Sequence, residues 1–106
     1  MPIKKQERLI KIVPSRAKGK KYTAFVKNKS TGKTRKINFG ARNYQQYKDS
    51  TKLKKFSKKN HGDAKRRKNY FRRHSGVTGK RKALQKEWKK SKGKFNAKIL
   101  SHQYLW

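Results

Sequence analysis

The side chains that come nearest to a catalytic set are two histidines and one aspartate. His61 and Asp63 flank a single glycine, and His74 follows about three helical turns later. Such donors could hold a divalent cation for phosphodiester cleavage. Metal-dependent nucleases, however, usually present several carboxylates, and no other acidic residue lies near Asp63 in the sequence. Because Asp63 is also well suited to cap a helix, we expect no metal site here.

Two other patterns indicate phosphate chemistry but lack its usual context. The residue types of strand-transferring enzymes occur at Arg72, Arg73, His74 and Tyr104, but those enzymes need a much larger scaffold to hold two duplexes. Residues 32–34 read Gly-Lys-Thr, the ending of a phosphate-binding loop, without the upstream glycine and without a following helix. We therefore predict a protein that is not an enzyme, with no catalytic residue, no cofactor and no small-molecule substrate.

The dominant chemical feature is positive charge. The 106 residues include 35 Lys or Arg and only four Asp or Glu, which gives a formal net charge of +31. Such a chain favours a polyanionic partner. The Lys ammonium is a point charge suited to phosphate, whereas the Arg guanidinium can form paired hydrogen bonds to the edge of a base. The chain has 26 Lys and nine Arg, which predicts binding to the phosphate backbone with little recognition of sequence. Full neutralisation would cover about 31 phosphates, or roughly 15 base pairs of double-stranded DNA.

Composition also excludes several classes of protein. The absence of Cys excludes disulfides, thiolate zinc sites and cysteine nucleophiles. No apolar run approaches the roughly 20 residues of a membrane span, and no signal-peptide core follows Met1. The lysine-rich runs 52–59 and 80–94 could lie on an anionic membrane. The second run carries Leu84 and Trp88, but its apolar stripe is narrow, so we expect no membrane partner.

The elements that must position these charges predict a small single domain of the α+β class. Residues 8–13, 21–28 and 34–39 are typical of strands, and the turn at 28–33 joins the last two into a hairpin. We expect an N-terminal β-hairpin or three-stranded sheet followed by two to three short helices. Gly40-Ala41 should end the third strand, and Tyr44 and Tyr47 are spaced as on a helical turn.

The helices have recognisable ends. Asp63 should cap a helix over 64–75 that stops at Gly76. Thr78 should cap a second helix that extends to about residue 90, and Asn96 should cap a short last helix. Residues 1–8 form a basic arm and 9–106 the domain. Residues 96–106 form an apolar, aromatic anchor that packs either into its own core or onto another copy or a capsid protein; the contact residues would be Leu100, Tyr104, Leu105 and Trp106.

The expected phosphate contacts are basic residues of three segments. They are Lys18, Lys20 and Lys21 in the first loop, Lys54, Lys55, Lys58 and Lys59 in the connection before the first helix, and Lys65, Arg66, Arg72 and Arg73 on that helix. Most aromatic residues should form the core, because few aliphatic residues exist to build one. Tyr22 and Phe56 are candidates for exposed, stacking positions.

An ordered set of motifs adds a resemblance. Residues 39–44 read FGARNY, 47–49 YKD, 61–63 HGD, 72–74 RRH and 100–106 LSHQYLW. Over about residues 13–106 the chain resembles a family of small basic proteins from large nucleocytoplasmic DNA viruses of algae and amoebae, which has no settled activity. The resemblance implies a viral origin and packaging in the virion interior, with the host nucleus or viral factory as the site during infection. It carries over no catalytic residue.

Together these observations predict a viral protein that binds double-stranded DNA without sequence specificity, through the phosphate backbone, and condenses the genome. Two alternatives stay open. One is a minor capsid or internal scaffold protein that contacts acidic shell proteins. The other is an RNA-binding protein, since composition alone does not separate the two nucleic acids.

Overall fold

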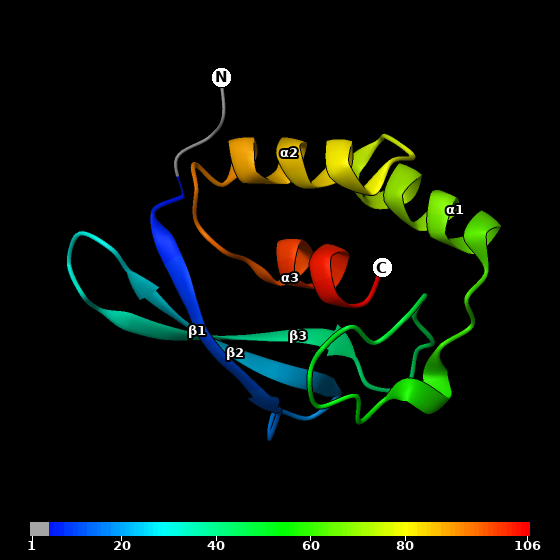
Figure 1. Ribbon diagram of the computed structural model, residues 1–106, viewed down its shortest axis with the longest axis horizontal. Coiled ribbons are helices and arrows are strands. Elements are labelled where there is room, and N and C mark those ends of the chain that lie inside the picture. Colours follow the sequence, from blue (N-terminus) through cyan, green and yellow to red (C-terminus); the bar gives the residue numbers. More distant parts are fainter. Residues whose placement is uncertain (1–4) are drawn as a thin grey trace.

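The computed structural model describes residues 5–106 and contains a sheet followed by helices. Strands β1 (Glu7–Pro14), β2 (Lys20–Asn28) and β3 (Thr34–Ala41) form an antiparallel sheet in the order β1-β2-β3. The 3₁₀ turn η1 (Ser57–Lys59) and helices α1 (Ala64–Ser75), α2 (Lys80–Lys90) and α3 (Ala97–Tyr104) follow (Figure 1). The expected α+β domain with a three-stranded sheet is confirmed. Of the expected basic arm, residues 1–4 lie outside the described part, and Glu7 and Arg8 already belong to β1.

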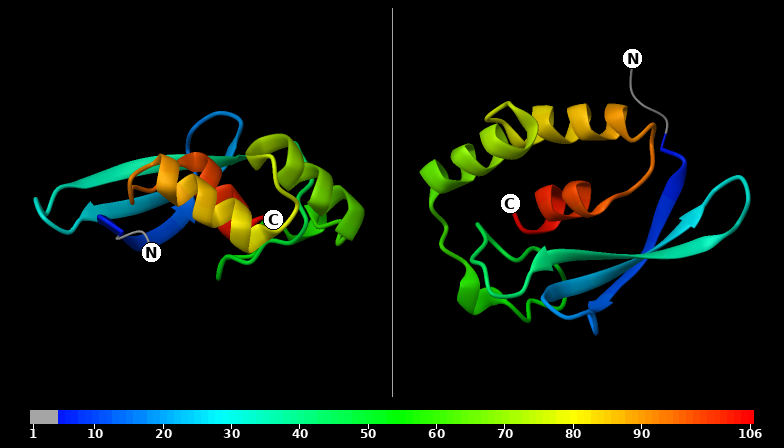
Figure 2. Two further views of the ribbon diagram at one scale, coloured as in Figure 1. Left: turned by 90° about the horizontal axis from the view of Figure 1, so that it is seen from above. Right: turned by 180° about the vertical axis from the view of Figure 1, so that it is seen from behind.

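The elements form three layers. Helix α3 lies between the sheet and the layer made by α1 and α2, as Figure 1 and the reverse view in Figure 2 both show. Alternate residues of a strand point to one face, and here that face meets α3. The buried apolar side chains are Tyr22, Ala24, Val26, Ile37 and Phe39 from the sheet, with Phe71, Ala83, Trp88, Phe95, Ile99, Leu100 and Leu105 from the helices and their connections.

The C-terminal anchor packs into the protein's own core. Leu100 and Leu105 are buried, and Tyr104 and Trp106 are partly buried against the same cluster. Of the two arrangements expected from the sequence, the structure has the intramolecular one. Leu100 and Leu105 are therefore not exposed to a second copy or a capsid protein.

Local signals set most helix ends. The Asp63 carboxylate accepts hydrogen bonds from the amides of Lys65 (2.9 Å) and Arg66 (3.2 Å), and α1 stops at Gly76, whose φ of 73° is left-handed. The side chain of Asn96 caps α3 in the same way. The predicted Thr78 cap is wrong: α2 begins at Lys80 after Gly79, which provides no side-chain cap.

Two expectations about residues 40–47 are also wrong. Strand β3 continues through Gly40 to Ala41, and Gly40 has a φ of 79°. A Cβ atom at Gly40 would lie 2.8 Å from Leu105 Cδ1, so glycine lets the strand pass close to the C-terminal segment. The spacing of Tyr44 and Tyr47 does not reflect a helical turn, because Gln46 instead forms an isolated bridge with Asn60.

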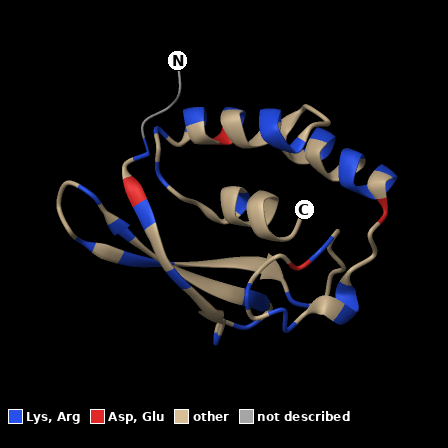
Figure 3. Ribbon diagram, in the orientation of Figure 1, with Lys and Arg blue, Asp and Glu red and all other residues tan. Residues whose placement is uncertain are grey.

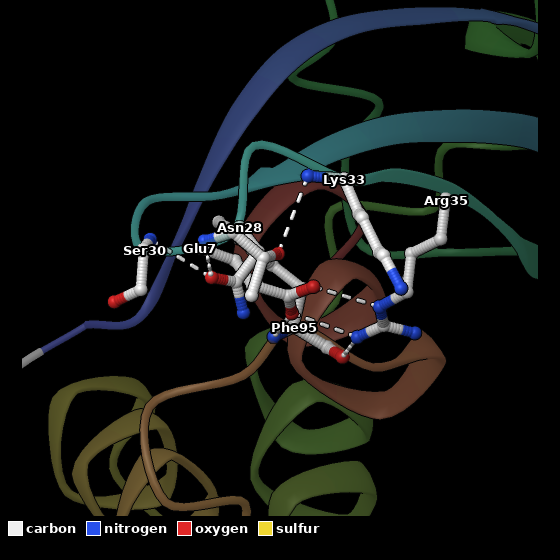
Figure 4. A network of polar contacts seen from close by, with 7 residues as sticks. Glu7, Asn28, Ser30, Lys33, Arg35 and Phe95 are labelled. Atoms are coloured by element: carbon white, nitrogen blue, oxygen red, sulfur yellow. Dashed lines mark hydrogen bonds and ion pairs between the residues drawn. The ribbon is translucent and has the colours of Figure 1, made fainter.

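Glu7 joins three distant segments (Figure 4). Its carboxylate accepts hydrogen bonds from Arg35 Nε (2.7 Å) and Nη2 (2.8 Å) on β3 and from the Phe95 amide (2.8 Å) before α3. Arg35 also donates to the Phe95 carbonyl. The hydrogen bonds from Arg35 hold the pKa of Glu7 below its usual value of 4.5, although burial opposes them. The pair thus fastens both edge strands of the sheet to the helical layer.

The other three acidic residues are also used within the fold. Asp49 accepts from the Tyr22 hydroxyl and from the amides of Thr51 and Phe56, Asp63 caps α1, and Glu87 on α2 accepts from Ser75 Oγ at 2.9 Å. Ser75 Oγ also lies 2.8 Å from Nε2 of His102, which is fully buried. Burial lowers the pKa of His102 to about 4, so this ring is neutral near pH 7.

Replacing Glu7 with Gln should lower the free energy of unfolding by about 2 kcal/mol, because the Arg35 guanidinium and the Phe95 amide lose their charged acceptor. The folded-state pKa of Glu7 lies below 4.5, so its contribution is complete above pH 4.5 and is lost as the pH falls through the folded-state pKa. Urea unfolding measured at several pH values checks both statements.

Asp63→Asn is the matched control for Glu7→Gln, since it changes the net charge equally and asparagine still caps a helix. Its cost should stay below about 1 kcal/mol, the loss of a charge at the helix N-terminus. Equal costs for the two variants would contradict the role given to Glu7.

Candidate nucleic-acid interface

A basic groove of about 830 Å³ lies where the end of β3, residues 44–46, α1 and the C-terminal segment meet. Its cationic side chains are Lys20, Arg66, Arg73 and Lys98, with Lys21 at its base. None of the described residues that line it is acidic. Arg66, Tyr70 and Arg73 share one face of α1 because residues three or four positions apart are neighbours on a helix. The groove is therefore suited to an anionic ligand.

The structure brings together only some of the expected phosphate contacts. Lys20, Arg66 and Arg73 line the groove, whereas Lys65 and Arg72 are exposed on α1 outside it and Lys18 is exposed before β2. A separate group lies on the loop between β3 and α1. There Lys54, Lys55 and Lys58 are exposed, and Lys59 is partly buried.

Lys21 must be removed from the expected phosphate contacts. Only 2% of this residue is exposed, and its Nζ donates to the Tyr44 carbonyl at 2.6 Å and to Gln46 Oε1. Burial lowers the pKa of Lys21 to about 8, although the charge of Asp49 works in the opposite direction. The sequence does not predict the burial of Lys21, because Lys20 and Lys21 are adjacent lysines that differ in exposure only after the loop has folded over Lys21. Lys21 ties that loop to the sheet.

The loop that carries the lysines is held by polar side chains. Gln46 Nε2 donates to the Phe56 carbonyl (2.7 Å) and to Asn60 Oδ1 (2.7 Å), and the Asp49 amide donates to the same Asn60 oxygen. Gln46 and Asp49 are both buried. The exposed lysines of residues 52–58 therefore project from a well-defined frame.

The exposed aromatic residue is not one of those expected. Tyr22 is fully buried, and the ring of Phe56 is partly buried and packs edge-on against it at 5.4 Å between centroids. Instead, Tyr44 is 74% exposed and lies at the groove. The polar neighbours Asn43 and Gln45, in a segment following a glycine, were the only sequence signal for an exposed ring there.

The open face of the sheet is a second basic surface, which sequence reasoning missed. Lys11, Phe25 and Lys36 lie opposite one another on the three strands, and the two Nζ atoms are 4.9 Å and 5.5 Å from the centre of the Phe25 ring. Arg8 and Lys27 form the next row. Lys11, Lys36, Arg8 and Lys27 are all exposed. We call this set the sheet face.

The outer layer of helices is a third basic surface, here called the helix face. Its exposed members are Lys65, Lys68, Arg72, Arg81, Lys82, Lys86, Lys89 and Lys90 on α1 and α2. Figure 3 shows Lys and Arg along these helices and also on the strands and loop across the α3 layer. Positive charge is thus present on both outer layers of the molecule.

Two of the three residues considered for metal binding, His61 and Asp63, have hydrogen-bond partners in the fold. His61 Nδ1 accepts from the Asp63 amide at 2.9 Å, and the Asp63 carboxylate faces the start of α1. Within residues 5–106, no three His, Asp or Glu side chains are grouped so that they could hold a metal ion. No helix in that range is long and apolar enough to cross a membrane.

Residues 10–57 match the model of a family of unknown function, DUF5754. The match spans most of the sheet and the loop up to the start of η1, which is less than half of the chain. The region it covers includes Lys11, Lys27 and Lys36 of the sheet face, but not Arg8, and also Lys20, Lys21 and Tyr44. No curated protein and no solved structure matches the chain.

Lysine acetylation should distinguish Lys21 from its neighbours. In the folded protein an N-hydroxysuccinimide acetate reagent should modify the exposed Lys18 and Lys20 at least about tenfold faster than Lys21, which must await local opening. Peptide mass spectrometry measures the rates, and urea should remove the difference. Faster modification of Lys21, as its lowered pKa alone would favour, would contradict its burial.

Proposed function

We propose that this protein binds double-stranded DNA without sequence specificity, neutralises its phosphates and condenses it. The observation that carries the proposal is the division of charge: every Asp and Glu carboxylate accepts hydrogen bonds that hold the fold together, while exposed Lys and Arg occupy both the sheet face and the helix face. Release of counterions from DNA then drives binding at either face.

Two charged faces permit one molecule to contact two duplex segments. The sheet face and the helix face belong to opposite outer layers, separated by α3, in a molecule with principal extents of 39 × 34 × 21 Å. A bridging protein brings phosphate backbones together and shields their repulsion. Condensation therefore needs no self-association through the C-terminal segment, which is packed in the protein's own core.

The viral part of the proposal rests on the resemblance of the motifs to small basic proteins of large DNA viruses. A long genome in a capsid is a dense polyanion that requires compensation, and a lysine-rich folded protein supplies it. We accordingly propose the virion interior as the final location.

Binding should depend steeply on salt. Titration of random-sequence duplex DNA by fluorescence anisotropy should give log K against log[salt] with a slope of about −5 or steeper, which corresponds to about six or more phosphate contacts. Duplex RNA is the comparison ligand. Equal affinity for RNA would contradict the DNA assignment. Negligible binding of every nucleic acid near physiological salt would overturn the proposal and favour an acidic protein as the partner.

Bridging should require both faces. A sheet-face variant (Lys11, Lys27 and Lys36 to Gln) and a helix-face variant (Lys65, Arg72 and Lys82 to Gln) each lose three charges from exposed positions. Each should still bind a single duplex, with the salt slope shallower by at most about 2.7, yet bridge duplexes less well than the native protein. Energy transfer between two labelled duplexes measures bridging. Normal bridging by both variants would contradict the two-face arrangement.

A further inference from the structure

The groove differs from the two flat basic faces because it combines cations with an exposed ring. Tyr44 is the most exposed of the large apolar side chains in the described chain, and Lys20, Arg66 and Arg73 surround the same groove. A phosphate needs only the cations. A base, by contrast, needs an exposed aromatic ring on which it can stack, and such a ring lies beside the cations here.

The backbone under Tyr44 is fixed although its ring is exposed. The buried Lys21 ammonium donates to the Tyr44 carbonyl, and the Tyr44 amide donates to the Ala41 carbonyl at 3.2 Å. Two residues later, Gln46 is buried and bridged to Asn60. The ring is therefore presented on a preorganised segment, which reduces the entropy lost when a ligand stacks on it.

The polar residues around the ring are also oriented. Arg66 Nη1 donates to Gln45 Oε1 at 2.8 Å, which joins α1 to the segment that carries Tyr44. The amides of Gln45 and Asn69 line the groove and can bond to base edges without selecting one base. Trp106 and Tyr70 also line the groove, and their rings stack on each other at 4.1 Å between centroids with the planes 3° apart.

We infer that the groove binds an unpaired nucleotide of a nucleic-acid strand, with its base stacked on Tyr44 and its phosphate held by Lys20, Arg66 and Arg73. Inside a duplex both faces of each base are covered by its neighbours, whereas an unpaired end, gap or loop offers the ring a base that can enter the groove. The volume of about 830 Å³ is within the range of small-ligand sites. The inference rests on the proposed nucleic-acid binding and adds a preference for strand ends and gaps.

The test compares a blunt duplex of about 15 base pairs with the same duplex carrying a single-stranded overhang that contains 2-aminopurine. Anisotropy gives the affinities and 2-aminopurine quenching reports stacking. The native protein should bind the overhang substrate more tightly and quench its fluorescence. Tyr44→Ala should lose about tenfold in affinity for the overhang substrate, should lose the quenching, and should keep its affinity for blunt duplex.

The chain supplies matched controls. Arg72 is exposed on α1 beside Arg73 but outside the groove, so Arg73→Gln should reduce the overhang preference more than Arg72→Gln at equal charge. Leu53→Ala removes another exposed apolar side chain of the same loop and should leave the preference intact. Thermal melting of each variant verifies that these surface changes preserve the fold.

The outcomes separate the two proposals. If blunt and overhang substrates bind alike, or if Tyr44→Ala and Arg73→Gln behave as their controls do, the groove inference is overturned while duplex binding stands. If neither substrate binds, both proposals fail. If a free deoxynucleoside monophosphate binds the groove more tightly than the overhang does, the site belongs to a soluble nucleotide and the inference of a strand ligand is overturned.

Discussion

The constraint on which this fold depends is the scarcity of negative charge. A net charge of +31 makes the chain repel itself, and four carboxylates are all it has to set against that repulsion. Each one lies at a junction: Glu7 joins β1 to β3 and to the segment before α3, Asp49 joins the loop to β2, Asp63 starts α1, and Glu87 joins α2 to α1. All four accept hydrogen bonds within the fold, and Glu7, Asp49 and Glu87 are buried, so the surface remains strongly positive.

Backbone carbonyls hold several of the cations that point inward. Lys21 donates to the carbonyl of Tyr44, Arg67 to that of Trp106 and Lys80 to that of Gln103. The carbonyl of Trp106 thus allows Arg67 to occupy a partly buried position on α1. The Arg67 guanidinium also lies 4.7 Å from the centre of the Tyr47 ring. A carbonyl satisfies the hydrogen bonds of a cation without cancelling its charge, so the field of the protein persists.

The sequence predicts what short-range rules control. Alternation along residues 21–28 identified β2, and Asp63, Gly76 and Asn96 marked helix ends, because strand faces and caps depend on neighbours in the chain. Positions that depend on long-range packing were missed. Lys21 is buried because a loop more than 20 residues away closes over it, and Tyr44 is exposed because the same loop is anchored through Gln46 instead of forming a helical turn. Of the expected contacts, Lys20, Arg66 and Arg73 line the same groove. Their positions in the sequence do not predict that they come together.

The stability of the fold and the proposed binding of DNA depend on the same charges. The core contains few aliphatic side chains, and the repulsion among exposed Lys and Arg opposes the compact state. A polyanion that lies along either face removes part of that repulsion, and a ligand that binds only the folded chain stabilises it by mass action. The unfolded chain carries the same charges but does not present them as two faces and a groove. In the proposed function, the arrangement of the charges therefore makes the folded chain a better ligand for DNA than the unfolded chain of equal charge, and the four hydrogen-bonded carboxylates maintain that arrangement.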